Sequence, residues 1–303
     1  MWRFRDGKAG HERQTAGLVQ ALGRLRATEV HDLPVAAIRH AAWAWLGGRC
    51  EAGRDLPDPD VIVGAGRGCE FPLLAARRAR GGRSIYLMQP RLPCGFFDLC
   101  FVPHHDAPRA GPHCEPTEGV LNDVEPAPGP RGTTTLVLVG GPSRHHAWDE
   151  DAILKQLGSI VFGSRERELL ITDSRRTPAS TRSALASFVR PGVRYVPFAG
   201  TGPEWLRAQL AVVRAAWVTA DSASMIFEAL TAGIPVGVIA VAAQRDDRIS
   251  RLAPALAAAG RVTTLDGWLA SGRLAAAGPP LAEAARAAAL VVARWFSDYD
   301  AAP

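Results

Sequence analysis

Two serines, Ser222 and Ser224, stand where an apolar run gives way to the pattern of a helix. Free backbone N–H groups and the positive end of the helix dipole make such a helix start attractive to anions. Glu228 lies four residues after Ser224 and therefore on the same helix face. The spacing suits a nucleotide-sugar, with its phosphate at the serines and a sugar hydroxyl at Glu228. An ordinary capped helix is the alternative interpretation, because serine and aspartate are also the usual N-caps.

Two other loops in the same half of the chain have a composition suited to phosphate. Their glycine, serine and arginine residues are Gly140, Gly141, Ser143, Ser174, Arg175 and Arg176. Glycine allows the backbone to approach a ligand closely, and arginine can bind phosphate through two parallel hydrogen bonds. Taken alone, each loop also fits a structural turn or a solvent-exposed loop. Because loops that follow parallel strands gather at one edge of a sheet, one polyanionic ligand such as a nucleoside diphosphate accounts for all three.

Glycine-rich segments also occur in the N-terminal half, at 6–14 and 64–68. Their spacing is neither that of a P-loop nor that of a dinucleotide-binding loop. Lys8, Gln14 and Gly66 lie in these segments as candidate contacts to an acceptor substrate, although structural turns explain the segments equally well. The adjacent histidines at 104–105 match no common zinc spacing, so no metal site is predicted.

The chain of 303 residues has a formal net charge of +5, carried almost entirely by arginine, since lysine occurs only at Lys8 and Lys155. This composition indicates a GC-rich bacterial genome rather than nucleic-acid binding. The basic run at 77–80 could contact an anionic membrane surface, but a solvated helix face is the simpler interpretation. Five cysteines without C-x-x-C spacing suggest reduced thiols in a cytoplasmic protein. With no apolar run of about 18 residues and no signal-peptide pattern, neither a transmembrane helix nor export is expected.

Apolar runs of strand length alternate with helical patterns along the chain. The expected strands are 2–4, 61–65, 84–88, 99–102, 135–139, 168–172, 193–197, 217–219 and 235–239. The expected helices are 11–26, 71–80, 149–157, 178–189, 204–214, 222–232, 248–258 and 281–296. Near-continuous apolar strands between helices indicate parallel sheets that are covered on both faces.

A proline- and glycine-rich stretch at 124–133 separates two such patterns, and a fresh strand begins directly after it. We therefore expect an α/β protein with two doubly wound, Rossmann-like domains that face a cleft. The expected domains are 1–128 on the acceptor side and 129–280 on the nucleotide-sugar side, followed by a last helix within 281–303. Ligands of open α/β sheets bind at the carboxyl ends of the strands, so the site is expected at those ends.

Five segments occur in an order that resembles one protein family. They are DGKAGH at 6–11 with Gln14, PHHD at 103–106, VGGPS at 139–143, TDSRRTP at 172–178 and TADSASM at 219–225. Over nearly the whole chain, the sequence is similar to bacterial members of the mitochondrial-fission ELM family, formerly a domain of unknown function. That family resembles the glycosyltransferases of the GT-B fold, particularly those that act on membrane-linked sugar acceptors.

The resemblance implies that the C-terminal domain binds the nucleotide-sugar and that the last helix crosses back onto the N-terminal domain. The implied donor-binding residues are Gly140, Gly141, Ser143, Arg175, Arg176, Ser222, Ser224, Met225 and Glu228, with Ser174 in the same loop as the arginines. Enzymes of this fold need no metal ion or other cofactor, because helix dipoles and basic side chains stabilise the leaving diphosphate.

The resulting hypothesis is a metal-independent glycosyltransferase that moves a sugar from a nucleoside diphosphate to a lipid-linked or cell-envelope saccharide. It would act in the cytoplasm, with peripheral contact to the inner face of the membrane. Asp6, His11 and Asp106 are the candidates for a catalytic base. Two alternatives stay open: a nucleotide-sugar epimerase on the same scaffold, and a non-catalytic adaptor that recruits a protein partner.

Overall fold

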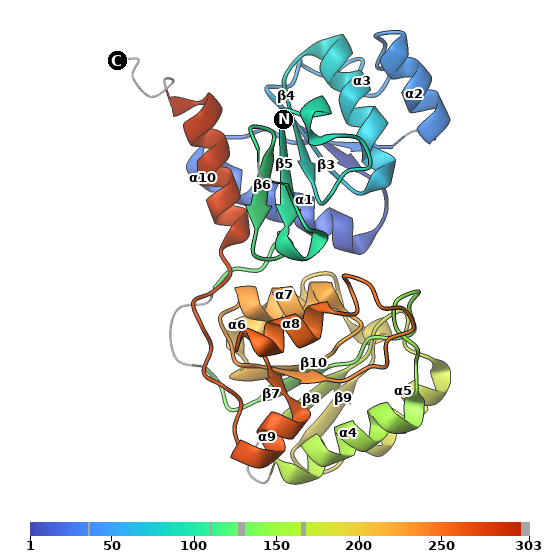
Figure 1. Cartoon of the computed structure of the whole chain (residues 1–303), viewed down its shortest axis with the longest axis vertical. Helices are drawn as coiled ribbons and strands as arrows, with labels where there is room; N and C mark the ends of the chain where they lie inside the picture. Colours follow the sequence, from blue (N-terminus) through green and yellow to red (C-terminus); the bar gives the residue numbers. More distant parts are fainter. Residues whose placement is uncertain (36, 110, 127–130, 165–167, 298–303) are drawn as a thin grey trace. The chain divides into compact units, whose positions relative to one another are not determined.

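The chain forms two compact α/β units in a computed structural model (Figure 1). The structure describes residues 1–35, 37–109, 111–126, 131–164 and 168–297. Unit 1 contains Met1–Asp123 together with the C-terminal segment that starts at Ala282, and unit 2 is Val124–Leu281. Each unit is built around one parallel sheet of six strands.

The sheet of unit 1 has the strand order β2-β1-β3-β4-β5-β6. Its strands are β1 (Trp2–Arg5), β2 (His31–Pro34), β3 (Val61–Ala65), β4 (Arg83–Leu87), β5 (Leu99–Pro103) and β6 (Cys114–Thr117). Its helices are α1 (Ala9–Leu25), α2 (Ile38–Leu46), α3 (Glu70–Arg80) and α10 (Glu283–Trp295). Short 3-10 turns are η1 (Arg67–Cys69), η2 (Cys94–Phe96) and η3 (His104–Asp106).

Both faces of this sheet are buried at β3 and β5, which explains why these two strands are continuously apolar. Val61 and Val63 of β3 belong to the cluster that includes residues of α1 and α10. Ile62, which points to the other face, belongs to the cluster that includes residues of α3. Helix α10 is the last in the chain, yet it lies beside α1 (Figure 1). Buried Ala287 and Val291 hold it in the same apolar cluster as α1.

The sheet of unit 2 has the strand order β12-β11-β10-β7-β8-β9. Its strands are β7 (Thr135–Leu138), β8 (Leu169–Thr172), β9 (Val193–Val196), β10 (Ala215–Thr219), β11 (Val236–Ile239) and β12 (Thr263–Thr264). Its helices are α4 (Glu150–Gly163), α5 (Ala179–Ser187), α6 (Trp205–Val212), α7 (Ala223–Thr231), α8 (Leu252–Ala258) and α9 (Leu265–Ser271), with the 3-10 turn η4 (Phe198–Gly200).

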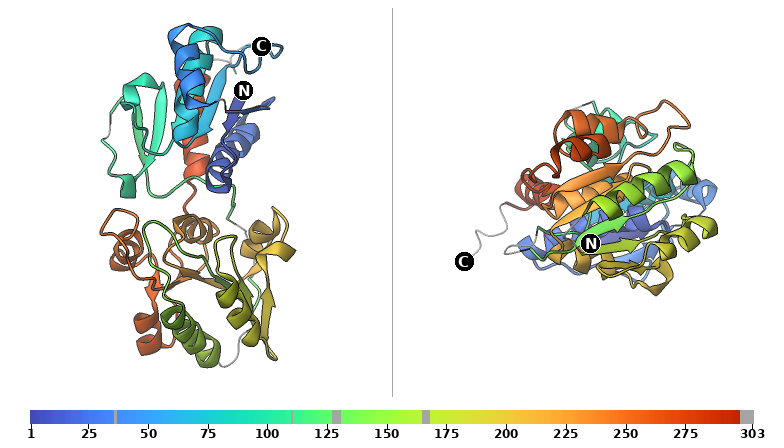
Figure 2. Two further views of the ribbon diagram at one scale, coloured as in Figure 1. Left: turned by 90° about the vertical axis from the view of Figure 1, so that its right-hand side faces the viewer. Right: turned by 90° about the horizontal axis from the view of Figure 1, so that it is seen from below.

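Helices cover both faces of this second sheet (Figures 1 and 2). On one face, Val137 and Trp217 pack with Leu157 of α4, Leu185 of α5 and Trp268 of α9. Helices α6, α7 and α8 lie on the opposite face (Figure 1). In both units the core is therefore a sheet between two layers of helices, as the alternating pattern of the sequence predicts.

Some elements differ from the sequence-based expectation. The apolar pattern does not reveal β2, β6, β12, α2 and α9, because these are short or carry few buried apolar residues. The helix expected from 248 begins at Leu252 instead. The Asp247 side chain accepts hydrogen bonds from the N–H groups of Ile249 (3.0 Å) and Ser250 (3.1 Å), and this turn competes with the first helical turn.

No helix in the described part of the chain combines the length and the apolar character that crossing a membrane requires.

Candidate functional site

The strand order of unit 2 reverses between β7 and β10. From β7 the chain continues to β8 and β9 on one side of the sheet, and then it returns to β10 on the other side. Open α/β sheets bind their ligands at the carboxyl ends of the strands beside such a reversal. The loop of Gly140 follows β7 and the loop of Asp221 follows β10, so two of the three loops with predicted donor residues flank this position.

Close packing between loops explains the two glycines after β7. A Cβ atom on Gly140 would overlap the Asp221 carboxylate, and one on Gly141 would overlap the backbone of Arg176. The N–H groups of these glycines donate hydrogen bonds to Thr219 Oγ1 (2.8 Å) and Asp221 Oδ2 (3.0 Å), respectively. The glycines therefore bring the loops together, and their N–H groups are already used.

The Asp221 carboxylate lies at the centre of this packing. Its side chain is completely buried, and Oδ2 accepts a hydrogen bond from the Arg176 guanidinium at 2.6 Å. The same guanidinium donates to the carbonyl oxygens of Gly141 (2.6 Å) and Pro142 (3.0 Å). A buried carboxylate needs such partners, because the loss of its hydration is costly. Arg176 thus joins the loops after β7, β8 and β10, while Asp221 Oδ1 has no hydrogen-bond partner in the described structure.

Arg175 differs from Arg176 in its surroundings. Both residues are exposed, but the Arg175 side chain has no partner among the described residues, and Arg182 contacts only the Arg175 carbonyl oxygen. The Arg175 guanidinium is therefore available for a bidentate contact with phosphate. Ser174, by contrast, is buried, and its Oγ lies 3.1 Å from Thr177 Oγ1. Ser174 shapes the turn that presents the two arginines.

Helix α7 begins at the same edge without a side-chain cap. Ser222 is its N-cap residue, but the Ser222 side chain accepts no hydrogen bond from the first turn. Among the described α-helices only α4 and α9 are capped through side-chain oxygens, those of Asp149 and Thr264, so α7 differs from most other helices in its place beside Asp221 and not in the missing cap. The N–H groups at the start of α7 thus keep their partial positive charge, which is the property of an anion site.

The predicted contact residues on α7 differ in accessibility. Ser224 and Met225 are half-buried and lie in the first turn. Glu228, one turn further, is 2% exposed. A ligand at the helix start can therefore touch Ser224 and Met225, whereas Glu228 belongs to the interior of the unit.

Two histidines outside the set of predicted site residues also lie at this edge. Ser143 Oγ accepts hydrogen bonds from the N–H groups of His145 (3.2 Å) and His146 (3.1 Å), so Ser143 shapes this loop. His146 is 2% exposed, and its Nδ1 has no hydrogen-bond partner among the described residues. Burial lowers the pKa of His146, and the nearby Asp221 carboxylate opposes that shift. The sequence signal was a histidine pair directly after a glycine–serine loop.

His145 connects this loop to the segment after β11. Its Nδ1 lies 2.6 Å from Asp247 Oδ2, and this hydrogen bond lowers the pKa of Asp247 to about 2. The backbone supports the same connection, because Gln244 N donates to His145 O at 2.9 Å. The loop with the buried histidine is therefore held from two sides, by Ser143 and by Asp247.

In unit 1 the strand order reverses between β1 and β3, and four predicted residues meet there. His11 Nδ1 lies 2.8 Å from Asp6 Oδ2, and Lys8 N donates to Asp6 Oδ1 at 3.1 Å. Gly66 has a φ of +80° and lies so close that a Cβ atom would overlap the His11 ring. The carboxylate fixes the orientation and the tautomer of the imidazole. Such a pair can accept or donate a proton at the second ring nitrogen.

Two more predicted residues of unit 1 are buried. Gln14 follows His11 by one turn of α1. Asp106 lies in η3 after β5, three strand positions from β1 and thus roughly 14 Å along the edge. Its Oδ2 lies 3.5 Å from Gln89 N. Within the described residues, no group of three or more His, Cys, Asp or Glu side chains is arranged to hold a metal ion.

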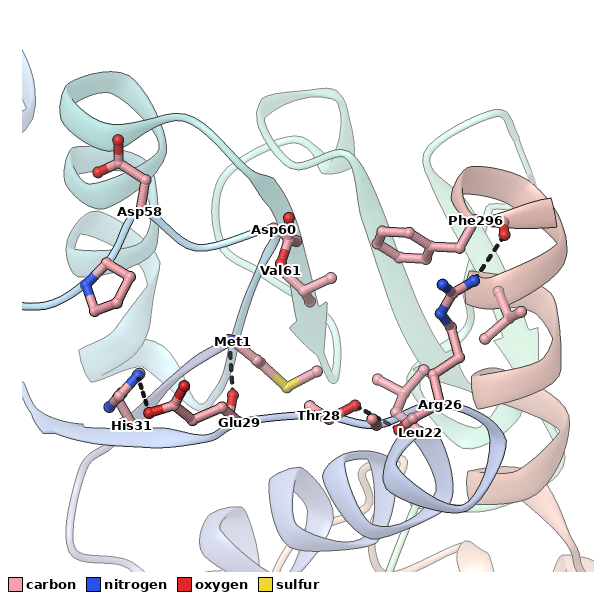
Figure 3. Close-up of a pocket in the computed structure, with 13 residues that line it drawn as sticks. Met1, Leu22, Arg26, Thr28, Glu29, His31, Asp58, Asp60, Val61 and Phe296 are labelled. Carbon is pink, nitrogen blue, oxygen red and sulfur yellow. Dashed lines mark hydrogen bonds and ion pairs between the residues drawn. The ribbon is translucent and has the colours of Figure 1, made fainter. Parts of the chain in front are cut away.

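A cavity of about 200 Å³ lies at the opposite, amino-terminal edge of the unit 1 sheet (Figure 3). Met1, Leu22, Val61 and Phe296 give it an apolar wall, and further lining comes from polar residues. Those polar residues are Arg26, Thr28, Glu29, His31, Asp58 and Asp60. None of the predicted site residues lines this cavity. It is separate from the site, because the predicted residues follow the carboxyl ends of the strands.

Solved structures with the same architecture include UDP-GlcNAc 2-epimerases and a glycotransferase. UDP-GlcNAc 2-epimerase from Neisseria meningitidis bound to UDP-GlcNAc has a TM-score of 0.55 and 12% identity, over 97% of this chain and 98% of that chain. The UDP-GlcNAc 2-epimerase of Methanocaldococcus jannaschii has a TM-score of 0.55 and 11% identity, over 96% and 99%. The glycotransferase of kitacinnamycin has a TM-score of 0.52 and 14% identity, over 97% and 98%. These likenesses establish the fold: two Rossmann-like domains of the GT-B type.

At the level of sequence, a family model matches most of the chain. A comparison with curated proteins found no match. The family model described as mitochondrial fission ELM1 matches residues 9–295, which include nearly all of unit 1 and the whole of unit 2. The chain therefore belongs to the mitochondrial fission ELM1 family.

Proposed function

We propose that the protein is a metal-independent GT-B glycosyltransferase that binds a nucleoside-diphosphate sugar at the carboxyl edge of the unit 2 sheet. The observation that carries this proposal is the uncapped start of α7 at the same edge as Asp221 Oδ1 and His146 Nδ1, two buried polar atoms without a hydrogen-bond partner among the described residues. The helix start suits the diphosphate, and Asp221 Oδ1 can accept a hydrogen bond from a hydroxyl of the ligand. A ligand that carries both an anionic group and hydroxyl groups could contact the helix start and the buried polar atoms at the same time.

The transfer step requires stabilisation of the charge that develops on the departing diphosphate. In this proposal the dipole of α7 and the exposed Arg175 supply that stabilisation. Arg176 holds Asp221 in place and reduces the repulsion between its carboxylate and the phosphates. The bond between the anomeric carbon and the diphosphate breaks, and an oxygen of the acceptor forms the new bond.

The acceptor side of the proposal rests on unit 1. His11 accepts the proton of the attacking hydroxyl, and Asp6 keeps its ring in the required orientation. Lys8 and Gly66 flank this pair. The proposed acceptor is a lipid-linked or cell-envelope saccharide.

A nucleotide-sugar epimerase is the second candidate. Several structures with this fold are named UDP-GlcNAc 2-epimerases, and one of them is described in complex with UDP-GlcNAc and UDP. Epimerisation also needs groups that move protons, and His146 is a buried titratable group near the proposed sugar position. The two reactions differ in one respect: epimerisation needs no acceptor.

Thermal unfolding with a panel of nucleoside diphosphates and their sugars tests the proposal. A ligand that binds only the folded state raises the melting temperature, and we expect this for one nucleotide base. The decisive variant is Ala223→Pro, which removes one free N–H at the first position of α7, where proline fits a helix. It should abolish the ligand-induced shift and leave the melting temperature of the free protein nearly unchanged.

Product analysis then separates the candidate functions. Release of nucleoside diphosphate that depends on a saccharide acceptor supports the transferase. Formation of a new nucleotide-sugar without any acceptor contradicts the transferase and supports the epimerase. If no nucleotide shifts the melting temperature at millimolar concentration, both enzymes are contradicted and the adaptor becomes the better hypothesis.

A further inference from the structure

Helix α2 of unit 1 exposes two large apolar side chains to solvent. Trp43 is 74% exposed and Leu46 is 57% exposed. The helix itself is firmly packed through another residue, Trp45, whose ring lies 5.8 Å from the rings of Phe71 and Phe96. The exposure of Trp43 and Leu46 is therefore a property of a fixed helix that lies beside α3 (Figure 1).

These two side chains share one face with an arginine. Arg39, Trp43 and Leu46 are spaced by four and three residues, which places them in a row along the helix. We call this row, together with the adjacent Arg49 and Arg78, the α2 surface. All three of its arginines are exposed, and Arg78 Nε lies near Gly48 at the end of the helix. Helix α2 carries no acidic side chain.

The arginines of the α2 surface also differ from their neighbours in having no ion-pair partner among the described residues. On α3, Arg77 pairs with Asp98 at 2.9 Å and Arg80 pairs with Asp58 at 2.5 Å. No such contact is recorded for Arg39, Arg49 or Arg78. Their charge is thus uncompensated around an exposed tryptophan.

We infer that the α2 surface docks on an anionic lipid membrane. Tryptophan prefers the membrane–water interface, because its ring is apolar and its indole N–H can remain hydrogen-bonded. Arginine can extend from an apolar patch to lipid phosphates. A helix of nine residues buries little area, so binding is weak, reversible and dependent on salt. The inference rests on unit 1 alone and does not depend on the proposed donor site.

Sedimentation with lipid vesicles tests this inference on the full chain. We expect binding to vesicles in which roughly one third of the phosphatidylcholine is replaced by phosphatidylglycerol, and loss of that binding as salt increases. Trp43→Ser should weaken binding roughly tenfold, and Leu46→Ser should weaken it less, in proportion to the apolar area removed. Arg39→Gln should weaken binding to the anionic vesicles only.

Matched variants on unit 2 provide the controls. Leu269 of α9 is 56% exposed, almost the same as Leu46, so Leu269→Ser should leave vesicle binding unchanged. Arg194 is exposed on β9, and Arg194→Gln is the control for Arg39→Gln. Equal binding by Trp43→Ser and the unaltered protein would overturn the inference. A dimer that depends on Trp43, seen in sedimentation velocity without lipid, would also overturn it in favour of a second copy of the chain.

Discussion

The carboxyl edges of the two sheets, where the strands end, use charged groups in different ways. In unit 2, Asp221 is buried and tied to Arg176, while the adjacent helix start has no cap and no charge of its own. In unit 1, Asp6 is tied to an imidazole, His11, and the helix that follows begins next to Lys8. The first arrangement creates fixed positive potential for an anion, and the second holds a group that can exchange a proton. In the proposed function, one fold that is present twice in the chain binds the donor at one sheet edge and moves a proton at the other.

The largest effect is expected for Gly66→Ala in unit 1. A Cβ atom there would displace the His11 ring, and a misplaced catalytic group can cost roughly a hundredfold in turnover. Gly81 is the matched control, because its φ of +77° imposes similar backbone strain but no atom of the described residues lies within 4 Å of the position of an added Cβ. Steady-state assays should show the loss for Gly66→Ala and not for Gly81→Ala. Equal turnover of the two variants would remove His11 from the mechanism.

The next largest effect concerns the stability of unit 2. Asp221→Ala leaves the Arg176 guanidinium and the Gly141 N–H without their acceptor, and we expect a loss of about 2 kcal/mol in the free energy of unfolding. Asp246→Asn, which breaks an exposed pair with Arg251, should change stability little. Urea denaturation of both variants makes the comparison. A small effect of Asp221→Ala would mean that its pair with Arg176 does not hold the three loops together.

The two adjacent arginines allow a sharper test of the binding edge. Arg175→Gln should weaken nucleotide binding about tenfold without a change in stability, because its side chain has no recorded partner in the described structure. Arg176→Gln should destabilise the protein as well, because Asp221 then loses its ion-pair partner. Isothermal titration calorimetry and urea denaturation separate the two outcomes. If both variants behave alike, the distinction between a ligand contact and a loop clamp is wrong.

The smallest effect is a dependence of stability on pH that comes from His146. Its pKa in the folded protein is lowered from 6.5, chiefly by burial, so the unfolded chain binds a proton first as the pH falls. The contribution of neutral His146 to the free energy of unfolding is therefore complete above pH 6.5 and declines below it. Urea denaturation between about pH 5 and 8, the range in which histidine titrates, should show that the free energy of unfolding changes less with pH for His146→Gln than for the unaltered protein. An unchanged slope would contradict the buried, neutral state of this residue.

The sequence predicts most strands of the two sheets, because the signal for a buried strand lies within the strand and the loop that follows it. Buried strands such as Val61–Ala65 are apolar throughout, and glycine or serine loops follow them directly. Strand β2 escapes detection because only Leu33 of its four residues is buried. Helix α2 escapes because its row of exposed Trp43 and Leu46 disrupts the usual pattern of one apolar and one polar face.

The contacts within the candidate site were harder to predict, because they join residues that are distant in sequence. Arg176 and Asp221 are 45 residues apart, and nothing near either one indicates that they pair. The same holds for Gly66, whose role depends on His11. By contrast, Asp6 and His11 are five residues apart at a strand-to-helix turn, and their proximity follows from that local geometry.

The return of α10 to unit 1 has a consequence for biosynthesis. Unit 1 is interrupted in sequence by the whole of unit 2, and its apolar surface on α1 is covered only when residues from Ala282 onward have been made. Unit 2 is continuous and can complete its core on the ribosome while unit 1 still waits for its last helix. The nascent chain thus carries an unfinished first domain during most of its synthesis, and a chain terminated shortly before Ala282 would present Leu18 and Leu22 to chaperones and proteases.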